Sequence, residues 1–287
     1  MTKALFHSSD LDGACAGAIV KYQYPECEMI GVNYGKPFPW DSIQPGETVY
    51  MVDFTLQPFE LMEQLAALCD LVWIDHHKTE VEEAVKRGFN PPGRRRIGIG
   101  ACALVWEYLY SPLDIPEAVR LLAEYDVFDH TDPRTLPFQY GFRFYENTFP
   151  DNQDLWVPFF EDFAALIKEV CEIGDIILKY EARQNAKFCK GYAFKTTLKD
   201  PSSDRELTAW CVNRGFTNSK VFDSVYDPVC DDLMITFCRL PLPAGKWTVS
   251  LYSTKDDIDC GTIARAFGGG GHAGAASFQT EKLPFEH

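Results

Sequence analysis

Short, almost entirely apolar runs alternate with longer amphipathic segments in the first part of the chain. Strands are predicted for four of these runs, at 3–8, 29–34, 48–53 and 71–75. Helices are predicted between them, at 14–24 and 58–69. Near-continuous apolar strands that alternate with helices are typical of a parallel sheet covered on both faces. The pattern therefore predicts an α/β fold with a doubly wound parallel sheet in the N-terminal part.

The middle of the chain has a different pattern. Apolar residues cover all sides of segment 101–110, which predicts a buried helix, and a second helix over 116–125 leads into Asp126. Segment 131–154 is irregular and carries a dense aromatic run over 138–145. We interpret this run as one face of an extended segment packed on the core; the alternative is a stacking platform for bases.

The last part of the chain is predicted to form a second, smaller domain. Apolar residues at three- and four-residue spacing over 155–189 predict a helical connector. Beyond it, strands are predicted for 192–198, 207–213, 233–240 and 247–252, and a helix for 260–267. This order favours an α+β domain with a mixed sheet. The predicted division is a doubly wound domain at 1–152, a helical connector at 153–190 and the α+β domain at 191–287.

Composition narrows the class of partner. The 287 residues carry a formal net charge of -15, which opposes binding to long nucleic acid, including long duplexes. A short anionic substrate is compatible with this charge, because bound divalent cations would reverse the local field. Ten cysteines without a C-x-x-C pair, together with no signal segment at the start, predict reduced thiols in a cytoplasmic protein. No apolar run approaches the length of a membrane span.

Acidic residues and histidines follow the predicted strands at the points where these strands end. The residues are His7, Asp10, Asp12, Asp53, Asp75, His76 and His77. Gly13, which comes directly after Asp12, permits a tight turn before the first helix. Because ligands bind at the carboxyl ends of strands in parallel sheets, we expect these side chains to gather at one edge. A single aspartate there is more typical of a solvated turn, and only the whole set favours a functional site.

The donor types in this set suit divalent metal ions. Two ions could be held by His7, Asp10, Asp12, Asp53, His76 and Asp126. Mg²⁺ and Mn²⁺ favour carboxylate ligands, and Mn²⁺ also accepts imidazole. Asp53, on a central strand, is the natural bridge between the ions, and Asp129 or His130 could replace Asp126. Two ions about 3.5–4 Å apart can bind a hydroxide and neutralise a phosphoryl group during in-line attack.

Three residues are expected to act in catalysis, namely Asp53, Asp75 and His77. Asp75 is expected to orient a histidine, and His77 to face the substrate as a phosphate donor or general acid. Segment 94–96, three adjacent arginines, could attract phosphate, although such a run is more typical of a solvated loop.

A glycine run near the C-terminus indicates a second chemical feature. Gly269, Gly270, Gly271 and His272 follow the last predicted helix. Glycines at this place let backbone N–H groups approach an anion closely, and His272 adds a donor. Glycines alone would favour a flexible loop, but the small residues that follow His272 favour close packing. We therefore predict that this run binds substrate.

Together these motifs resemble the DHH phosphoesterases with a DHH-associated C-terminal domain, and most closely the oligoribonuclease (nano-RNase) type. The similarity lies in 7–13, Asp53, Asp75-His76-His77, Asp126 and 268–276. It implies a hydrolase whose N-terminal domain holds two Mn²⁺ ions, with Mg²⁺ as a substitute, and whose C-terminal domain grips a nucleotide. The implied reaction is hydrolysis of phosphodiester bonds in short oligoribonucleotides or linear dinucleotides. The implied alternative is a phosphatase for 3′-phosphoadenosine phosphate.

One departure from the family concerns substrate binding. The C-terminal domain of the family often carries Ser-x-Arg-Ser, whereas the matching segment here has Tyr252 in place of the arginine. A tyrosine does not pair with phosphate as a guanidinium does, so we expect Tyr252 to stack on a base or Arg265 to take over the anion contact.

The alternative to an enzyme is a catalytically inactive module that binds or senses a nucleotide. Loss of a metal ligand would mark it, and no such loss is visible in the sequence. A homodimer is compatible with either hypothesis.

Overall fold

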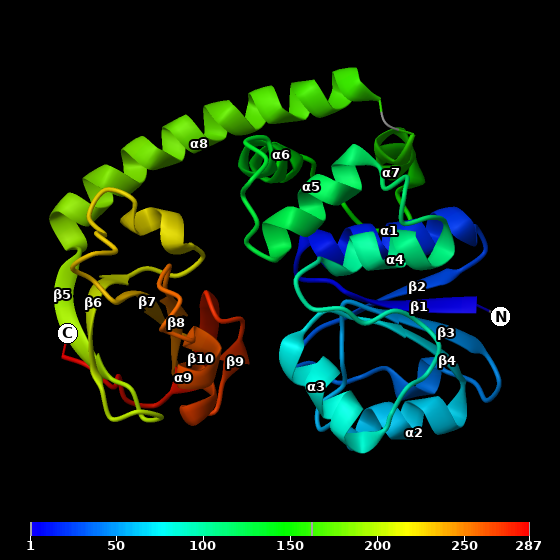
Figure 1. Cartoon of the computed structure of the whole chain (residues 1–287), viewed down its shortest axis with the longest axis horizontal. Helices are drawn as coiled ribbons and strands as arrows, with labels where there is room; N and C mark the ends of the chain where they lie inside the picture. The colour runs from blue at the N-terminus through cyan, green and yellow to red at the C-terminus, as the bar shows by residue number, and fades with distance from the viewer. Residues whose placement is uncertain (1, 162, 287) are drawn as a thin grey trace. The chain divides into compact units, whose positions relative to one another are not determined.

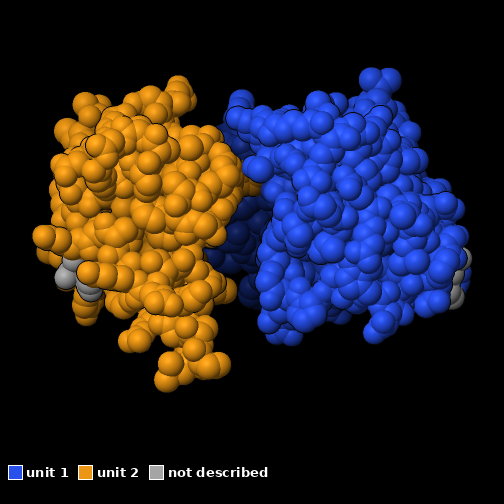
Figure 2. Space-filling model, turned by 90° about the horizontal axis from the view of Figure 1, so that it is seen from below, with its two compact units in different colours: residues 1–177 blue, residues 178–287 orange. Residues whose placement is uncertain are grey.

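The computed structural model describes residues 2–161 and 163–286. The chain divides into two compact units, residues 1–177 and 178–287 (Figure 2). The division falls within the long helix α8 (Ala164–Tyr192), inside the range predicted to connect two domains. The three-part division at 1–152, 153–190 and 191–287 itself stays a prediction.

The first unit is built on a four-stranded parallel sheet. Its strands are β1 (Thr2–His7), β2 (Glu28–Val32), β3 (Thr48–Val52) and β4 (Asp70–Ile74), in the order β2-β1-β3-β4. Side chains alternate between the faces, so that Phe6 and Val52 join one buried cluster while Met51 and Trp73 join another. Both faces are therefore buried, and the predicted doubly wound α/β fold is confirmed.

Helices cover the two faces of this sheet (Figure 1). One face carries α1 (Leu11–Gln23), α4 (Ala101–Leu109) and α5 (Glu117–Asp126). The other carries α2 (Glu60–Leu68) and α3 (Lys78–Arg87), after the short 3₁₀ helix η1 (Trp40–Ser42). The sequence interpretation missed α3, because its exposed face is so polar that only Ala84 is buried.

The segment predicted to be irregular, 131–154, contains one helix, and a second helix begins at its last two residues. These are α6 (Thr135–Phe142) and α7 (Gln153–Phe160). The extended conformation predicted for the aromatic run is wrong, because Phe138 and Phe142 lie four residues apart on one helical face. The two-residue spacing of the aromatic residues concealed this pair. Their predicted place in the core is confirmed, since both side chains are fully buried.

The second unit contains a six-stranded mixed sheet. Its strands are β5 (Phe194–Lys199), β6 (Glu206–Asn213), β7 (Leu233–Arg239), β8 (Trp247–Tyr252), β9 (Gly270–Gly271) and β10 (Ala275–Thr280). Their order is β5-β6-β7-β8-β10-β9, and β6 and β7 are parallel whereas the other neighbours are antiparallel. Helix α9 (Cys260–Ala266) packs on one face and η2 (Ser219–Phe222) on the other. The predicted α+β architecture is confirmed.

Gly13 lies inside the first turn of α1 and not in a tight turn before it, as the sequence had indicated. A Cβ atom at this position would collide with the carbonyl oxygen of His7. The glycine therefore lets α1 begin directly against the end of β1. There the carboxylate of Asp10 caps the helix by accepting the N–H of Gly13 at 2.9 Å.

We expect Gly13→Ala to lower the free energy of unfolding by about 1–3 kcal/mol, because the added methyl group must displace backbone. Gly191→Ala is the matched control. It is also a helical glycine, but open space surrounds it, so alanine should be neutral or up to about 1 kcal/mol stabilising. Urea unfolding followed by circular dichroism measures both. A Gly13→Ala variant as stable as the wild type would show that this contact does not set the start of α1.

Candidate metal centre

The structure brings the strand-end residues of the first unit into one cluster. His7 ends β1, Asp53 follows β3, and Asp75 follows β4. Three groups of side chains have donor atoms within 4.8 Å of one another: His7, Asp10 and Asp53; Asp12, His76 and Asp126; and Asp53, Asp75, His76 and His77. The carboxyl edge of the sheet thus gathers all eight residues predicted to be metal ligands or catalytic groups in this unit, although their roles remain predictions.

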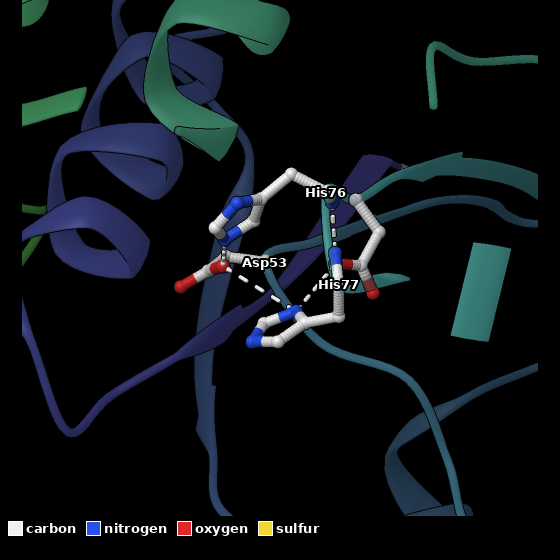
Figure 3. Close-up of side chains that lie close together, drawn as sticks. Asp53, His76 and His77 are labelled. Atoms are coloured by element: carbon white, nitrogen blue, oxygen red, sulfur yellow. Dashed lines mark hydrogen bonds and ion pairs between the residues drawn. The ribbon is translucent and has the colours of Figure 1, made fainter. Parts of the chain in front are cut away.

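Asp53 occupies the centre of the cluster. Its Oδ2 lies 3.5 Å from Nδ1 of His7, and its Oδ1 lies 3.2 Å from Nε2 of His76 (Figure 3). Burial opposes ionisation of Asp53, but His7 and His76 outweigh burial and hold its pKa below the usual range. The backbone of Asp53 is left-handed, with a φ of 56°, a strained conformation that aims the carboxylate between two histidines.

The other donors lie on the two sides of Asp53. On one side, Nδ1 of His7 is 3.0 Å from Oδ2 of Asp10. On the other side, Nε2 of His76 is 3.2 Å from Oδ2 of Asp126 and 3.8 Å from Oδ2 of Asp12. The carboxylate of Asp53 is therefore shared by two donor groups, one on each of its oxygen atoms.

The structure separates the two aspartates considered for the last position of the set. Asp126 ends α5 and points to His76. Asp129 instead accepts hydrogen bonds from the backbone and the hydroxyl of Thr131, at 3.0 and 2.5 Å. Asp126 is therefore the aspartate that lies in the cluster.

Asp12 has a structural function that the sequence did not show. Its two oxygens accept the backbone N–H groups of Ala101 at 2.6 Å and Cys102 at 2.9 Å, at the N-terminus of α4. These N–H groups have no partner within their own helix, and the helix dipole favours a negative charge at this end. Burial and the neighbouring Asp53 nevertheless raise the pKa of Asp12 to about 7. Asp12 thus joins α4 to the cluster, although its carboxylate lies close to the negative charge of Asp53.

Asp75 is fully buried and accepts hydrogen bonds on both oxygens. Oδ1 contacts Nδ1 of His77 at 2.6 Å and accepts the backbone N–H of His76 at 2.7 Å. Oδ2 accepts the hydroxyl of Thr55 at 2.5 Å and the indole N–H of Trp73 at 3.4 Å. The predicted orienting role of Asp75 therefore concerns the ring of His77, because Asp75 reaches His76 through the backbone. Thr55 was missed, since a lone threonine after a strand carries no sequence signal.

His77 is held as a cation in this arrangement. Burial opposes its protonation, but Asp75, and more weakly Asp53, outweigh burial and raise the pKa of His77 to about 11. The side chain is 22% exposed, unlike the buried ring of His76. A partly exposed imidazolium beside a carboxylate cluster is a suitable donor to a phosphate oxygen.

The residues fit one or two divalent metal ions. Nδ1 of His7 and Oδ1 of Asp53 are buried, and neither has a hydrogen bond of good geometry to any described residue. Buried polar atoms normally have a partner, so these two atoms fit coordination of a cation by this cluster. Burial, and next the negative charge of Asp12, raise the pKa of Asp126. A cation would relieve this repulsion, and carboxylates with imidazoles are donors that Mn²⁺ accepts.

The residues predicted to bind substrate lie in the second unit. Tyr252 donates its hydroxyl to the backbone oxygen of Thr217 at 3.5 Å, and Arg265 donates to the hydroxyl of Thr262 at 2.7 Å. Gly270 and Gly271 form β9, which pairs with β10. A Cβ atom on Gly269 would collide with the carbonyl oxygen of Ser277. Close packing against β10 therefore explains Gly269 and Gly271, whereas a Cβ atom on Gly270 would meet no neighbour. The contact of the glycine run with an anion, like that of His272, stays a prediction.

The architecture defines a class of fold. It consists of a parallel sheet covered on both faces, followed in the chain by a smaller unit with a mixed sheet. Two solved structures share it. A pGpG-specific phosphodiesterase from Vibrio cholerae, PggH, aligns with a TM-score of 0.52 at 13% identity, over 98% of this chain and 93% of that one. An exopolyphosphatase-related protein from Bacteroides fragilis aligns with a TM-score of 0.50 at 14% identity, over 98% and 87%. At these identities the similarity concerns the fold alone.

Sequence comparison adds one relative. An uncharacterized protein of Acanthamoeba polyphaga mimivirus, R106, is 27% identical over 250 residues, which cover 84% of this chain and 56% of that protein. The chain thus spans about half the length of the curated relative that it matches. No protein-family model matches the sequence. Within residues 2–161 and 163–286, none of the helices combines the length and the apolar character needed to span a membrane.

We expect two aspartates of the cluster to differ strongly in their effect on stability. Asp75→Ala removes the acceptor for Thr55, Trp73 and His77 in a fully buried place, which should cost about 3 kcal/mol or more. Asp10→Ala removes one helix cap on a side chain that is 38% exposed, which should cost about 1 kcal/mol. Urea unfolding in EDTA separates these effects from metal binding. Equal losses would contradict a structural role for the Asp75 contacts.

Proposed function

We propose that this protein is a metal-dependent phosphodiesterase that hydrolyses short oligoribonucleotides or linear dinucleotides. The observation that carries the proposal is the carboxylate of Asp53, whose two oxygens face two separate donor groups, one at His7 and one at His76. A carboxylate placed in this way can bridge two metal ions. The fold shared with proteins named as a phosphodiesterase and as an exopolyphosphatase-related protein supports the same class of reaction.

The metal ligands in this proposal are His7, Asp10, Asp12, Asp53, His76 and Asp126, and the ions are two Mn²⁺, with Mg²⁺ as a substitute. When bound, such ions supply positive charge for the phosphoryl group and lower the pKa of water. Asp53 would fix the distance between the two donor groups. His77, held by Asp75, would donate a hydrogen bond to a phosphate oxygen of the substrate.

The charge of the chain supports a short substrate. A net charge of -15 repels a long polyanion along most of the surface, whereas a dinucleotide meets only the local field of the metal centre. The name of the Vibrio cholerae neighbour, a pGpG-specific phosphodiesterase, supports a small nucleotide as well. We assign substrate recognition to the second unit, with Arg265, Tyr252, His272 and the glycines 269–271 as the residues concerned.

The test is a panel assay with Mn²⁺. The panel contains linear dinucleotides, short RNA, short DNA, 3′-phosphoadenosine phosphate and pyrophosphate. Preferred hydrolysis of dinucleotides or short RNA is expected. Preferred release of phosphate from 3′-phosphoadenosine phosphate would replace the proposal by a phosphatase. Nucleotide binding without turnover of any compound would indicate a binding module instead.

We expect Asp53→Ala to abolish hydrolysis of the best substrate in this panel while the protein remains folded. Activity that survives within about tenfold of the wild type, or about 1.4 kcal/mol in the barrier, would show that Asp53 does not bridge two ions. Asp129→Ala is the matched control, because this carboxylate lies only three residues from Asp126 but hydrogen-bonds to Thr131. It should retain full activity. Mn²⁺ titration by calorimetry should show fewer bound ions for Asp53→Ala and no change for Asp129→Ala.

We expect His272→Ala to weaken substrate binding more than metal binding, because the histidine belongs to the second unit and the cluster to the first. The measurements are KM for a linear dinucleotide and the Kd of Mn²⁺ for the same preparation. An equal loss of both affinities would contradict the assignment of metal binding and substrate binding to different units.

A further inference from the structure

The arginine segment 94–96 lies alongside the end of β4, next to Asp75 of the metal-centre cluster. The backbone N–H of Trp73 donates to the oxygen of Pro92 at 2.9 Å, and that of Asp75 donates to the oxygen of Arg94 at 3.2 Å. Arg95 forms a parallel bridge with Asp75. The segment is the partly exposed loop that the sequence favours, and these backbone hydrogen bonds attach it to β4 and Asp75.

The three arginines divide between the two sides of this edge. Arg95 donates to the backbone oxygen of Trp73 at 2.7 Å, and its guanidinium lies 5.2 Å from the centre of the Trp73 ring. Since side chains alternate along an extended segment, Arg94 and Arg96 project to the opposite side. There they reach α4. Arg95 thus anchors the segment, and its two neighbours form a pair.

One buried carboxylate holds this pair. Arg94 donates to Oε2 of Glu107 at 3.0 Å, and Arg96 donates to Oε1 at 2.6 Å. The side chain of Glu107 is only 5% exposed, whereas those of Arg94 and Arg96 are 39% and 50% exposed. A single guanidinium would neutralise the buried carboxylate, so the second leaves a net positive charge. Each guanidinium has five N–H donors, and one of them donates to Glu107.

The helix that carries Glu107 also contacts the metal-centre cluster. Asp12 accepts the N–H of Ala101 at the first residue of α4, and Glu107 lies six residues further along the same helix. At 1.5 Å per residue this is about 9 Å along the helix axis. The arginine segment thus joins the cluster through its backbone at Asp75, and the carboxylate that holds its guanidiniums lies on a helix whose first turn contacts the same cluster.

We propose that Arg94 and Arg96 bind a second phosphate of the substrate, the one next to the phosphodiester that is cleaved. The inference rests on the proposed function. Two partly exposed guanidiniums on a fixed carboxylate form a preorganised, positively charged site in a chain with a net charge of -15. Glu107 is the positioning residue, because it touches the arginines and not the substrate.

The test compares two dinucleotides that differ only in this phosphate, pApA and ApA. We expect Arg94→Gln and Arg96→Gln each to raise KM for pApA about tenfold, because each variant loses one charged hydrogen bond to the extra phosphate. KM for ApA, which lacks this phosphate, should change less than about twofold. Each single variant leaves one arginine on Glu107, so the fold should survive, which thermal unfolding checks. Arg87→Gln is the matched control, because Arg87 lies on α3 of the same unit and pairs with Glu60 and Glu83. It should change neither KM.

Equal effects on pApA and ApA, no effect on either, or the same effect in Arg87→Gln would each overturn the inference. Calorimetric titration with pApA in EDTA tests it without turnover. There the arginine variants should bind at least about fivefold more weakly than the wild type and Arg87→Gln should not. Absence of pApA binding to the wild type would also overturn the inference. If the wild type binds pApA through Arg94 and Arg96 but hydrolyses neither dinucleotide, only the proposed function fails.

Discussion

The sharing of the Asp53 carboxylate between His7 and His76 is the interaction on which the architecture of the site depends. It requires that β1, β3 and β4 end at the same level, since each supplies one participant. It also requires a left-handed backbone at a residue other than glycine, which costs on the order of 1–3 kcal/mol. The surrounding sheet and helices must stabilise this conformation. The parallel register of three strands therefore determines the chemistry of the site.

Several residues of the site also hold the fold together. Asp12 caps α4, and Asp75 gathers a hydroxyl, an indole, an imidazole and two backbone N–H groups on one carboxylate. Buried carboxylates are tolerated because they are hydrogen-bonded in this way. Activity and stability consequently share residues in the first unit, and measurements of activity on variants of Asp12 or Asp75 need a parallel measurement of unfolding.

The arginines near the site also divide between stabilising the fold and presenting charge at the surface. Arg95 stabilises the sheet edge through Trp73, whereas Arg94 and Arg96 are held at the surface by Glu107. In the second unit, Gly269 and Gly271 are required for the close approach to β10, which is a structural reason for part of a motif that also suits an anion. A motif can thus meet a packing requirement and a binding requirement at once, because both need backbone without side chains.

The sequence by itself determined the four strands of the first unit, the helices α1, α2, α4 and α5, and the acidic and histidine residues that follow the strands. Apolar runs and the residues that end them are local properties, so the chain reports them directly. The tertiary structure decided which of these residues meet. It placed Asp126 rather than Asp129 beside His76. It also set the ring of His77 within hydrogen-bonding distance of Asp75 and joined two arginines to Glu107 on α4. It also converted the aromatic run into a helix, because burial of Phe138 against distant side chains outweighed its local pattern. Apart from the pair of Asp75 and His77, these contacts join residues well separated in the chain, and their free energy exists only once the fold has formed.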